Sequence, residues 1–257
     1  MIVQEQHYSY DLPNQDSFAW LSFRPALAWT AILSLVLITS LGAIAGAGGI
    51  LRLLFPLMAT AVAALLYLRY PLLYIGFTWW IWFLTPLVRR LIDYQSGWQD
   101  PSIVLLAPPL VTSIAGVTLV RSLPTIHRQG GLPFILCFAS VFYGFLIGLI
   151  QNSVAGTIVA LLNWLPPLLF GFHLFVNWRQ YPVCRRTIQR TFLWGVLVMG
   201  GYGVWQYITA PEWDRFWVTN AVDTNVFGYP EPLGIRVWST MNSPQPFAAV
   251  MMAGLIL

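Results

Sequence analysis

The sequence contains no lysine and few charged residues of any kind. All 13 basic side chains are arginines, and the charged residues make up 9% of 257 residues. Soluble globular domains have about 25% charged residues, so this scarcity, together with 58% hydrophobic residues, excludes a soluble globular fold. Arginine side chains bind phosphate groups well, whether of lipid headgroups or of a pyrophosphate. Biased codon usage would also explain a sequence with arginine and no lysine. Because no basic run exceeds two residues, we expect no nucleic-acid partner.

Cysteine and histidine are also scarce. Cys137 lies in an apolar stretch and Cys184 in an arginine-rich one, so neither a disulfide framework nor a metal site is indicated. His7, His127 and His173 are far apart, and none has another ligand at metal-binding spacing. The sequence also lacks a nucleotide-binding glycine loop and a zinc motif. We therefore expect free thiols, no metal and no cofactor.

Long apolar runs dominate what is present and predict an all-α fold, a polytopic transmembrane helix bundle. A helix crosses the roughly 30 Å hydrocarbon layer with about 20 residues. Residues 1–26 are polar and predict a cytoplasmic N-terminal segment, whereas 27–257 predict a transmembrane helical domain. Charged residues divide that domain into about eight spans, the last incomplete, near residues 27–47, 53–68, 71–88, 102–120, 132–150, 155–177, 191–209 and from 245 onward.

The arginines predict the orientation of the bundle, because cytoplasmic loops carry an excess of basic residues. With the N-terminus inside, eight arginines lie on the inner side: Arg24, Arg69, Arg121, Arg128, Arg179, Arg185, Arg186 and Arg190. Five lie on the outer side: Arg52, Arg89, Arg90, Arg215 and Arg236. We therefore expect a cytoplasmic N-terminus, with the polar connections 89–101 and 210–243 facing outward.

Small residues and prolines mark places where helices pack closely or bend. Gly42-x-x-x-Gly46 and Gly144-x-x-x-Gly148 allow close helix approach, and packing within one subunit is the simpler interpretation, with dimerisation as the alternative. Prolines remove a backbone donor and should kink or interrupt three of the spans. These prolines are Pro56, Pro108–Pro109 and Pro166–Pro167.

The outer loop 210–243 contains the candidate site residues. Its aromatic side chains, among them Trp217 and Trp238, fit either interface anchors or a platform that stacks on sugar rings. Arg236 can neutralise a pyrophosphate leaving group bidentately without a metal; the alternative is pairing with Glu231 or with lipid headgroups. Ser239 and Asn242 can hold the turn through side-chain to backbone bonds.

The run Arg236-x-x-Ser239-Thr240-x-Asn242-x-Pro244 resembles a short signature of the O-antigen ligase and polymerase superfamily. The resemblance implies a metal-independent glycosyltransferase of the bacterial inner (plasma) membrane, active in polysaccharide biosynthesis for the cell envelope. Its partners would be membrane lipids, a polyprenyl-diphosphate-linked glycan donor and a glycan or lipid acceptor. Arg236 would be catalytic, and the substrate-binding residues would be Arg215, Trp217, Trp238, Ser239 and Asn242. Gln245 departs from the pattern, because members commonly have asparagine after this proline.

The resemblance also implies a further external loop and more helices, so the chain is expected to continue past Leu257 as the N-terminal portion of such a protein. Two other functions stay open: a membrane transporter, since cyanobacterial relatives of this superfamily have been labelled bicarbonate transporters, and a non-catalytic membrane subunit. A transporter should carry ionisable groups within its spans. Only His173 is expected there, which favours the transferase.

The predicted orientation can be checked with reporter fusions. Fusions after Gln129 and Arg186 are expected to report the cytoplasm, and a fusion after Asp223 the outer side, because the arginine excess keeps the first two connections inside. The reversed pattern would place Arg236 in the cytoplasm and rule out chemistry on the outer face.

Overall fold

The structure, a computed structural model, describes residues 26–124, 130–220 and 224–257. These ranges are helical, and their one β feature is an isolated bridge between Gly228 and Ile235. The helices are α1 (Ala26–Ile44), α2 (Gly48–Arg69), α3 (Pro71–Ser96), η2 (Ile103–Leu106), α4 (Ala107–Ser113), α5 (Gly116–Ser122), α6 (Leu132–Gln151), α7 (Val154–Val176), η4 (Trp178–Gln180), α8 (Tyr181–Thr209), α9 (Glu212–Asn220), α10 (Thr224–Phe227) and α11 (Pro244–Ile256). His7, Arg24, His127, Arg128 and Asp223 lie outside the described residues.

Six helical segments are long and apolar enough to cross a membrane: α1, α2, α3, the η2–α5 stretch, α6 and α7. The all-α architecture predicted from the apolar runs is therefore present in the described residues. Helix α8 is not among the six, because its first turns carry arginines and its later turns contain glycine, tyrosine and glutamine. Helix α11, with 13 residues, is shorter than a span.

Two helices extend beyond their predicted ends. Helix α3 continues to Ser96, so the expectation that residues 89–101 form an outer connection is wrong for its first eight residues. Arg89, Arg90 and Asp93 are buried on this extension. Charged residues were taken to end a span because they prefer water, but here they find partners inside the protein. Helix α8 begins at Tyr181, ten residues before the predicted start at 191.

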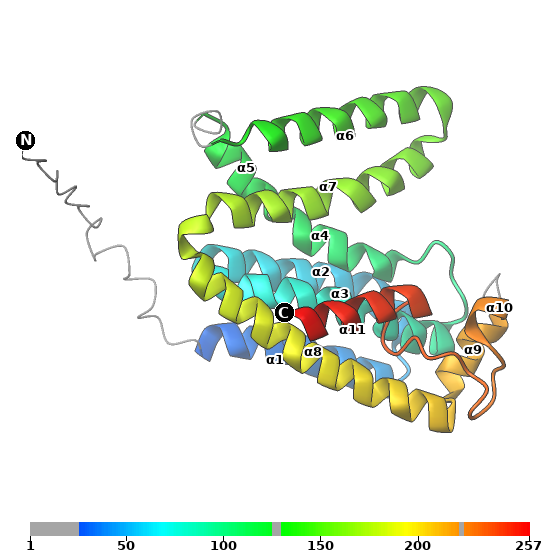
Figure 1. Cartoon of the computed structure of the whole chain (residues 1–257). Coiled ribbons are helices and arrows are strands. Elements are labelled where there is room, and N and C mark those ends of the chain that lie inside the picture. Colours follow the sequence, from blue (N-terminus) through cyan, green and yellow to red (C-terminus); the bar gives the residue numbers. More distant parts are fainter. Residues whose placement is uncertain (1–25, 125–129, 221–223) are drawn as a thin grey trace, which may run out of the picture.

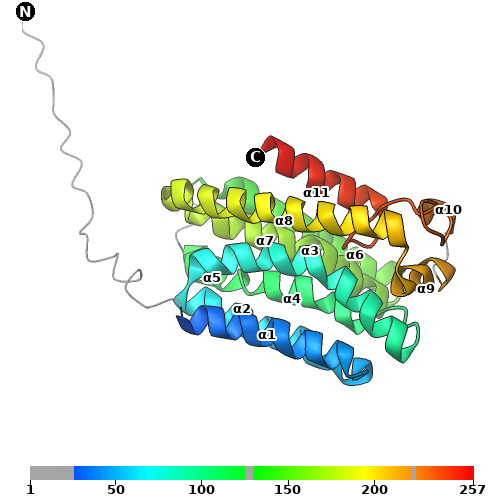
Figure 2. The same cartoon turned by 90° about the horizontal axis from the view of Figure 1, so that it is seen from below.

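The bundle is arranged around α3, which packs against α2, α4, α8 and α9 (Figures 1 and 2). Helix α1 lies against α2, and α11 lies along α8 on the other side of α3 (Figure 2). The hairpin of α6 and α7 stands apart in Figure 1, joined to the rest through α7. Helix α6 has no residue buried within the chain, so its apolar surface faces lipid in a membrane.

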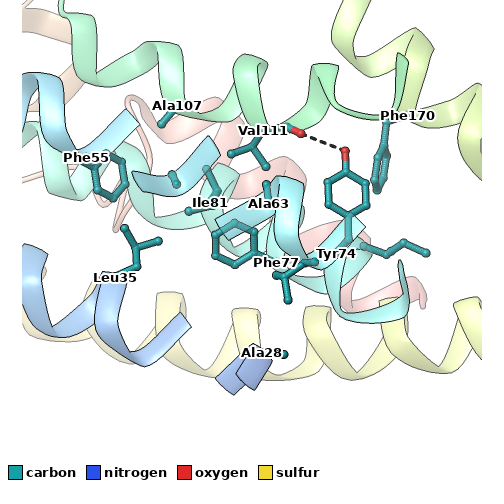
Figure 3. Packing of buried hydrophobic residues seen from close by; sticks show 14 of the residues in the cluster. Ala28, Leu35, Phe55, Ala63, Tyr74, Phe77, Ile81, Ala107, Val111 and Phe170 are labelled. Carbon is teal, nitrogen blue, oxygen red and sulfur yellow. Dashed lines mark hydrogen bonds between the residues drawn. The ribbon is translucent and has the colours of Figure 1, made fainter. Parts of the chain in front are cut away.

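The main core lies where α2, α3 and α4 meet, with contributions from α1 and α7 (Figure 3). Small residues such as Ala59 and Ala63 of α2 let the helices approach, and Phe55 and Ile81 fill the space between them. The one polar group shown in Figure 3 is satisfied: the Tyr74 hydroxyl donates to the Val111 carbonyl at 3.0 Å. Without this partner, a hydroxyl buried in an apolar core would be destabilising.

The predicted fourth span is interrupted, and it consists of η2, α4 and α5. Pro108 and Pro109 lie in the first turn of α4, where the 3-10 turn of η2 ends, and a further break separates Ser113 from Gly116. The broken segment is tied to its neighbours by polar contacts: Thr118 Oγ1 lies 2.6 Å from His173 Nδ1 and 2.8 Å from the Tyr67 hydroxyl. In contrast, α2 and α7 continue through Pro56 and Pro166–Pro167 as single helices.

Two glycines of the small-residue motifs, Gly42 and Gly148, pack closely against other side chains of the same chain. A Cβ on Gly42 would meet the Leu51 side chain at 3.0 Å, and one on Gly148 would meet Thr157 at 2.8 Å. Gly46 lies beyond the end of α1 in the left-handed region (φ +73°), so it forms the turn into α2 and not a helix face. A Cβ on Gly144 would meet nothing within 4 Å.

Two glycines of α8 provide a matched test of the α3–α8 contact. A Cβ on Gly195 would lie 2.8 Å from the buried Phe83 ring, which is held by Trp79 and Phe192, whereas one on Gly201 meets nothing within 4 Å. Gly195→Ala is expected to destabilise the fold by roughly 1–3 kcal/mol through overpacking. Gly201→Ala should stabilise it by roughly 0.5–1 kcal/mol through helix propensity. Thermal unfolding in detergent measures both, and equal effects would contradict the packing.

Candidate functional site

The segment 210–243, predicted as an outer loop, contains two short helices, α9 and α10, followed by the Gly228–Ile235 bridge and a turn into α11. It covers the end of the bundle where α3 and α8 finish, at the right of Figure 1. Helix α9 begins with Glu212 and Asp214, and acidic residues in a first turn are favoured by the helix dipole. The candidate site lies on this cap of the bundle.

A buried ion pair attaches the cap to the bundle. Arg90 Nη1 of α3 lies 2.5 Å from Asp214 Oδ1 of α9, and both side chains have 0% exposure. Asp214 Oδ2 accepts two more hydrogen bonds, from the Tyr202 hydroxyl and from Gln206 Nε2, both at 2.9 Å and both from α8. The buried carboxylate is therefore fully partnered, which a charge removed from water requires.

The same network holds the turn that follows Arg236. Arg90 Nη2 donates to the carbonyl of Ser239, and Gln206 Oε1 accepts from the backbone nitrogens of Trp238 at 3.1 Å and Ser239 at 2.9 Å. Ser239 Oγ donates to the Met199 carbonyl at 2.5 Å, and its backbone is left-handed (φ +53°). A non-glycine residue in this conformation is strained, and its three hydrogen-bonded groups hold it there.

A second charge network lies beside the first. The Asp93 carboxylate pairs with Arg89 at 3.2 Å and with Arg52 of α2 at 3.4 Å. The Arg89 guanidinium carbon lies 4.7 Å from the centre of the Trp217 ring and 5.2 Å from that of Trp98. Such cation–π contacts stabilise by about 2 kcal/mol or more when desolvated. Trp217 thus fastens α9 onto the extension of α3.

Arg236 is held by its backbone while its side chain is free. Its backbone nitrogen donates to the Phe227 carbonyl at 2.8 Å next to the bridge. A Cβ on Gly228 would lie 2.4 Å from the Gly234 carbonyl oxygen, so only glycine allows this close approach. The exposed guanidinium makes no hydrogen bond or ion pair with any described residue, Glu231 included.

The Arg236 side chain borders an open hollow of about 520 Å³. Its other lining residues come from α10 and from the first turns of α11: Val226, Pro244, Gln245 and Ala248. Ser243, at the N-cap of α11, makes no side-chain cap bond to the helix. A cation and a helix N-terminus therefore lie at the same hollow, and both favour a negatively charged ligand.

The other predicted substrate-binding residues have structural contacts. Arg215 donates to the carbonyls of Ala210 at 2.6 Å and Thr209 at 3.3 Å and so caps α8. Trp238 is fully buried and packs edge-on against Phe227, so it has no free face for a sugar. Trp217, Trp238 and Ser239, which were predicted to contact substrate, all have buried side chains in the structure.

Asn242 differs from these residues. It is half-buried next to the lining of the hollow, and its Oδ1 atom has no hydrogen-bond partner among the described residues. Of the predicted site residues, Arg236 therefore presents an exposed and unpaired group, whereas the unpartnered Asn242 Oδ1 atom is buried.

Sequence reasoning missed Arg90 and Gln206 as the supports of the site. The Arg89–Asp93 spacing of four residues was a usable signal, because it places opposite charges on one helix face and argues that the helix continues. Nothing local signals the Arg90–Asp214 pair, whose partners are 124 residues apart.

No group of three or more histidine, cysteine or carboxylate side chains that can hold a metal occurs among residues 26–124, 130–220 and 224–257. Comparison with known proteins adds no assignment: no family model, curated protein or solved structure matches the chain.

The Arg90–Asp214 pair generates a test by a double-mutant cycle. Arg90→Met and Asp214→Leu are each expected to destabilise the protein by roughly 3–5 kcal/mol, because each leaves a buried charge without its partner. The double variant should be less destabilised than the sum of the two, because no uncompensated charge remains. Unfolding in detergent measures the coupling, and strictly additive effects would show that the pair does not hold the cap.

Proposed function

We propose that the protein is a membrane glycosyltransferase of the O-antigen ligase type, which transfers or polymerises a polyprenyl-diphosphate-linked glycan at the outer face of the bacterial inner membrane. Arg236 binds the diphosphate of the donor in this proposal. The observation that carries it is the unpaired, exposed Arg236 side chain at an open hollow beside the first turn of α11. The resemblance of residues 236–244 to the superfamily signature supports it independently.

The chemistry requires stabilisation of the charge on the leaving group. A diphosphate gains negative charge as the bond to the sugar breaks, and a guanidinium can donate two parallel hydrogen bonds to it. Arg236 has all its donors free for this role. The dipole of α11 adds a partial positive charge next to it, with Gln245 in the first turn as a further donor.

Pre-organisation supports the same role. The backbone of Arg236 is held by the bridge, and the turn after it is held by Gln206 and Arg90. A group fixed before the substrate arrives loses less free energy in the transition state than a mobile one. The buried residues Trp238 and Ser239 thus act by positioning Arg236 and not by touching the glycan.

The orientation that this function needs is also part of the proposal: eight spans, with α8 and α11 included, and a cytoplasmic N-terminus. Helix α8 has 29 residues, which is about 43 Å and ample for a bilayer. The described carboxylates, Asp93, Asp100, Glu212, Asp214 and Glu231, all belong to the end of the bundle that carries Arg236. Among the described residues, the opposite end carries arginines and no aspartate or glutamate, which is the charge pattern expected of a cytoplasmic end.

A transporter is the second candidate, because α3 carries ionisable residues that the sequence reading did not expect inside a helix. Arg89, Arg90 and Asp93 are buried, and buried ionisable residues often mark ion pathways. Each of the three is paired with an opposite charge, which favours a structural role. Bicarbonate uptake is therefore measured alongside glycan transfer.

The proposed role of Arg236 can be tested in cells that carry the wild type, Arg236→Ala or Arg236→Lys at matched expression. Arg236→Ala is expected to lower transfer by roughly 10²–10³-fold, because one charge-assisted contact to the leaving group is lost, on the order of 2–4 kcal/mol. Arg236→Lys should restore only part of the rate, since an ammonium lacks the planar fork. The length and linkage of surface glycans are the measurement.

The matched control is Arg121→Ala, which removes an equally exposed arginine at the opposite end of the bundle. It should leave the glycans unchanged. Unchanged glycans with impaired bicarbonate uptake in Arg236→Ala would reject the transferase and support the transporter. Thermal stability of the purified variants shows whether any loss reflects folding.

A further inference from the structure

The end of the bundle opposite Arg236 is uniformly basic. Among the described residues it carries no aspartate or glutamate and six arginines: Arg69, Arg121, Arg179, Arg185, Arg186 and Arg190. Side-chain hydrogen bonds show that these arginines lie at one end of the bundle. Thr118 of α5 is hydrogen-bonded both to Tyr67, near the end of α2, and to His173, near the end of α7. The start of α8 joins the same end, since a Cβ on Gly76 of α3 would lie 3.1 Å from Thr191.

Four of these arginines are concentrated on η4 and the first turns of α8: Arg179, Arg185, Arg186 and Arg190. All four are exposed, and none makes a hydrogen bond or ion pair with a described residue. Like charges four residues apart on a helix, such as Arg186 and Arg190, disfavour each other by about 0.2–0.5 kcal/mol, so a bound anion would stabilise the cluster.

The length of α8 places the cluster at the level of lipid headgroups. Its 29 residues exceed the roughly 20 that cross the hydrocarbon layer. In the proposed topology, where α8 is a span, its apolar part 191–209 fills that layer, and the turns that precede it lie among the lipid phosphates. Trp178 and Tyr181 flank the arginines and are 64% and 60% exposed, as aromatic residues at a membrane interface are.

We propose that Arg179, Arg185, Arg186 and Arg190, flanked by Trp178 and Tyr181, form a binding surface for anionic phospholipid headgroups. The guanidinium groups donate bidentate hydrogen bonds to the lipid phosphates, and the N-terminal dipole of α8 adds to the positive potential. The buried Cys184 faces inward, so the arginines on the other sides of the helix remain open to lipid. This surface is separate from the Arg236 hollow and does not depend on the transfer reaction; it rests only on the part of the proposed function in which α8 is a span.

The chain offers one competing partner of its own. Glu5, Asp11 and Asp16 belong to the N-terminal segment, which lies outside the described residues. If that segment neutralised the arginines, the intact protein would show little preference for anionic lipid. The experiment therefore includes a variant in which these three carboxylates are changed to amides.

The experiment measures how strongly spin-labelled phosphatidylglycerol, compared with spin-labelled phosphatidylcholine, associates with the full chain reconstituted in phosphatidylcholine vesicles. The wild type is expected to prefer phosphatidylglycerol, and added salt should weaken the preference. Arg185→Gln/Arg186→Gln should reduce it by roughly fivefold for each arginine removed. The charge-matched control, Arg69→Gln/Arg121→Gln, removes two arginines from the same end and should retain most of the preference.

Three results would overturn the proposal: no preference in the wild type, equal losses in the two double variants, or a preference that arises only after Glu5, Asp11 and Asp16 are neutralised. The second would mean that the whole basic end acts as a diffuse charge. The third would mean that the N-terminal segment occupies the arginines in the intact chain. Helix content by circular dichroism confirms that each reconstituted variant is folded.

Discussion

The buried ion pair between Arg90 and Asp214 is the interaction on which the cap of the bundle depends. It joins α3 to α9, and through Tyr202 and Gln206 it includes α8. Because both charges are removed from water, breaking the pair would leave a buried charge without a partner, at a large cost in free energy. The pair therefore fixes the cap to the bundle. The strained backbone at Ser239 persists for the same reason, since three neighbouring elements fix it.

The paired charges of the two networks stabilise the fold, whereas the unpaired Arg236 side chain is available to a ligand. Asp93, Arg89 and Arg52 satisfy one another beneath the indoles of Trp98 and Trp217, so they stabilise the fold. Arg236, a few residues from the buried turn, has no such partner. A fixed backbone with an unsatisfied guanidinium at an open hollow is the arrangement that an anionic ligand needs. The rigid network thus explains why one arginine of this cap is available for chemistry while the others are not.

Charge is divided between the two ends of the molecule. At the end that carries the cap, arginines and carboxylates are mixed and largely paired. At the other end, arginines stand alone beside exposed aromatic residues. The paired charges at the capped end stabilise the fold, whereas the unpaired arginines at the other end need counter-charges from their surroundings. The apolar surface of α6, which has no buried residue, depends on the bilayer in the same manner.

The sequence alone determined the class of this protein and most of its helices, because hydropathy is a local property: apolar runs predicted α1, α6 and α7 to within about three residues at each end. It also marked Arg236, which keeps an exposed and unpaired guanidinium in the structure. Only the tertiary structure decided that α3 continues through Arg89 and Arg90, and that Trp217 and Trp238 are buried. A charge ends a span only when it lacks a partner in the protein, and the partner of Arg90 lies 124 residues away, beyond the reach of any local pattern.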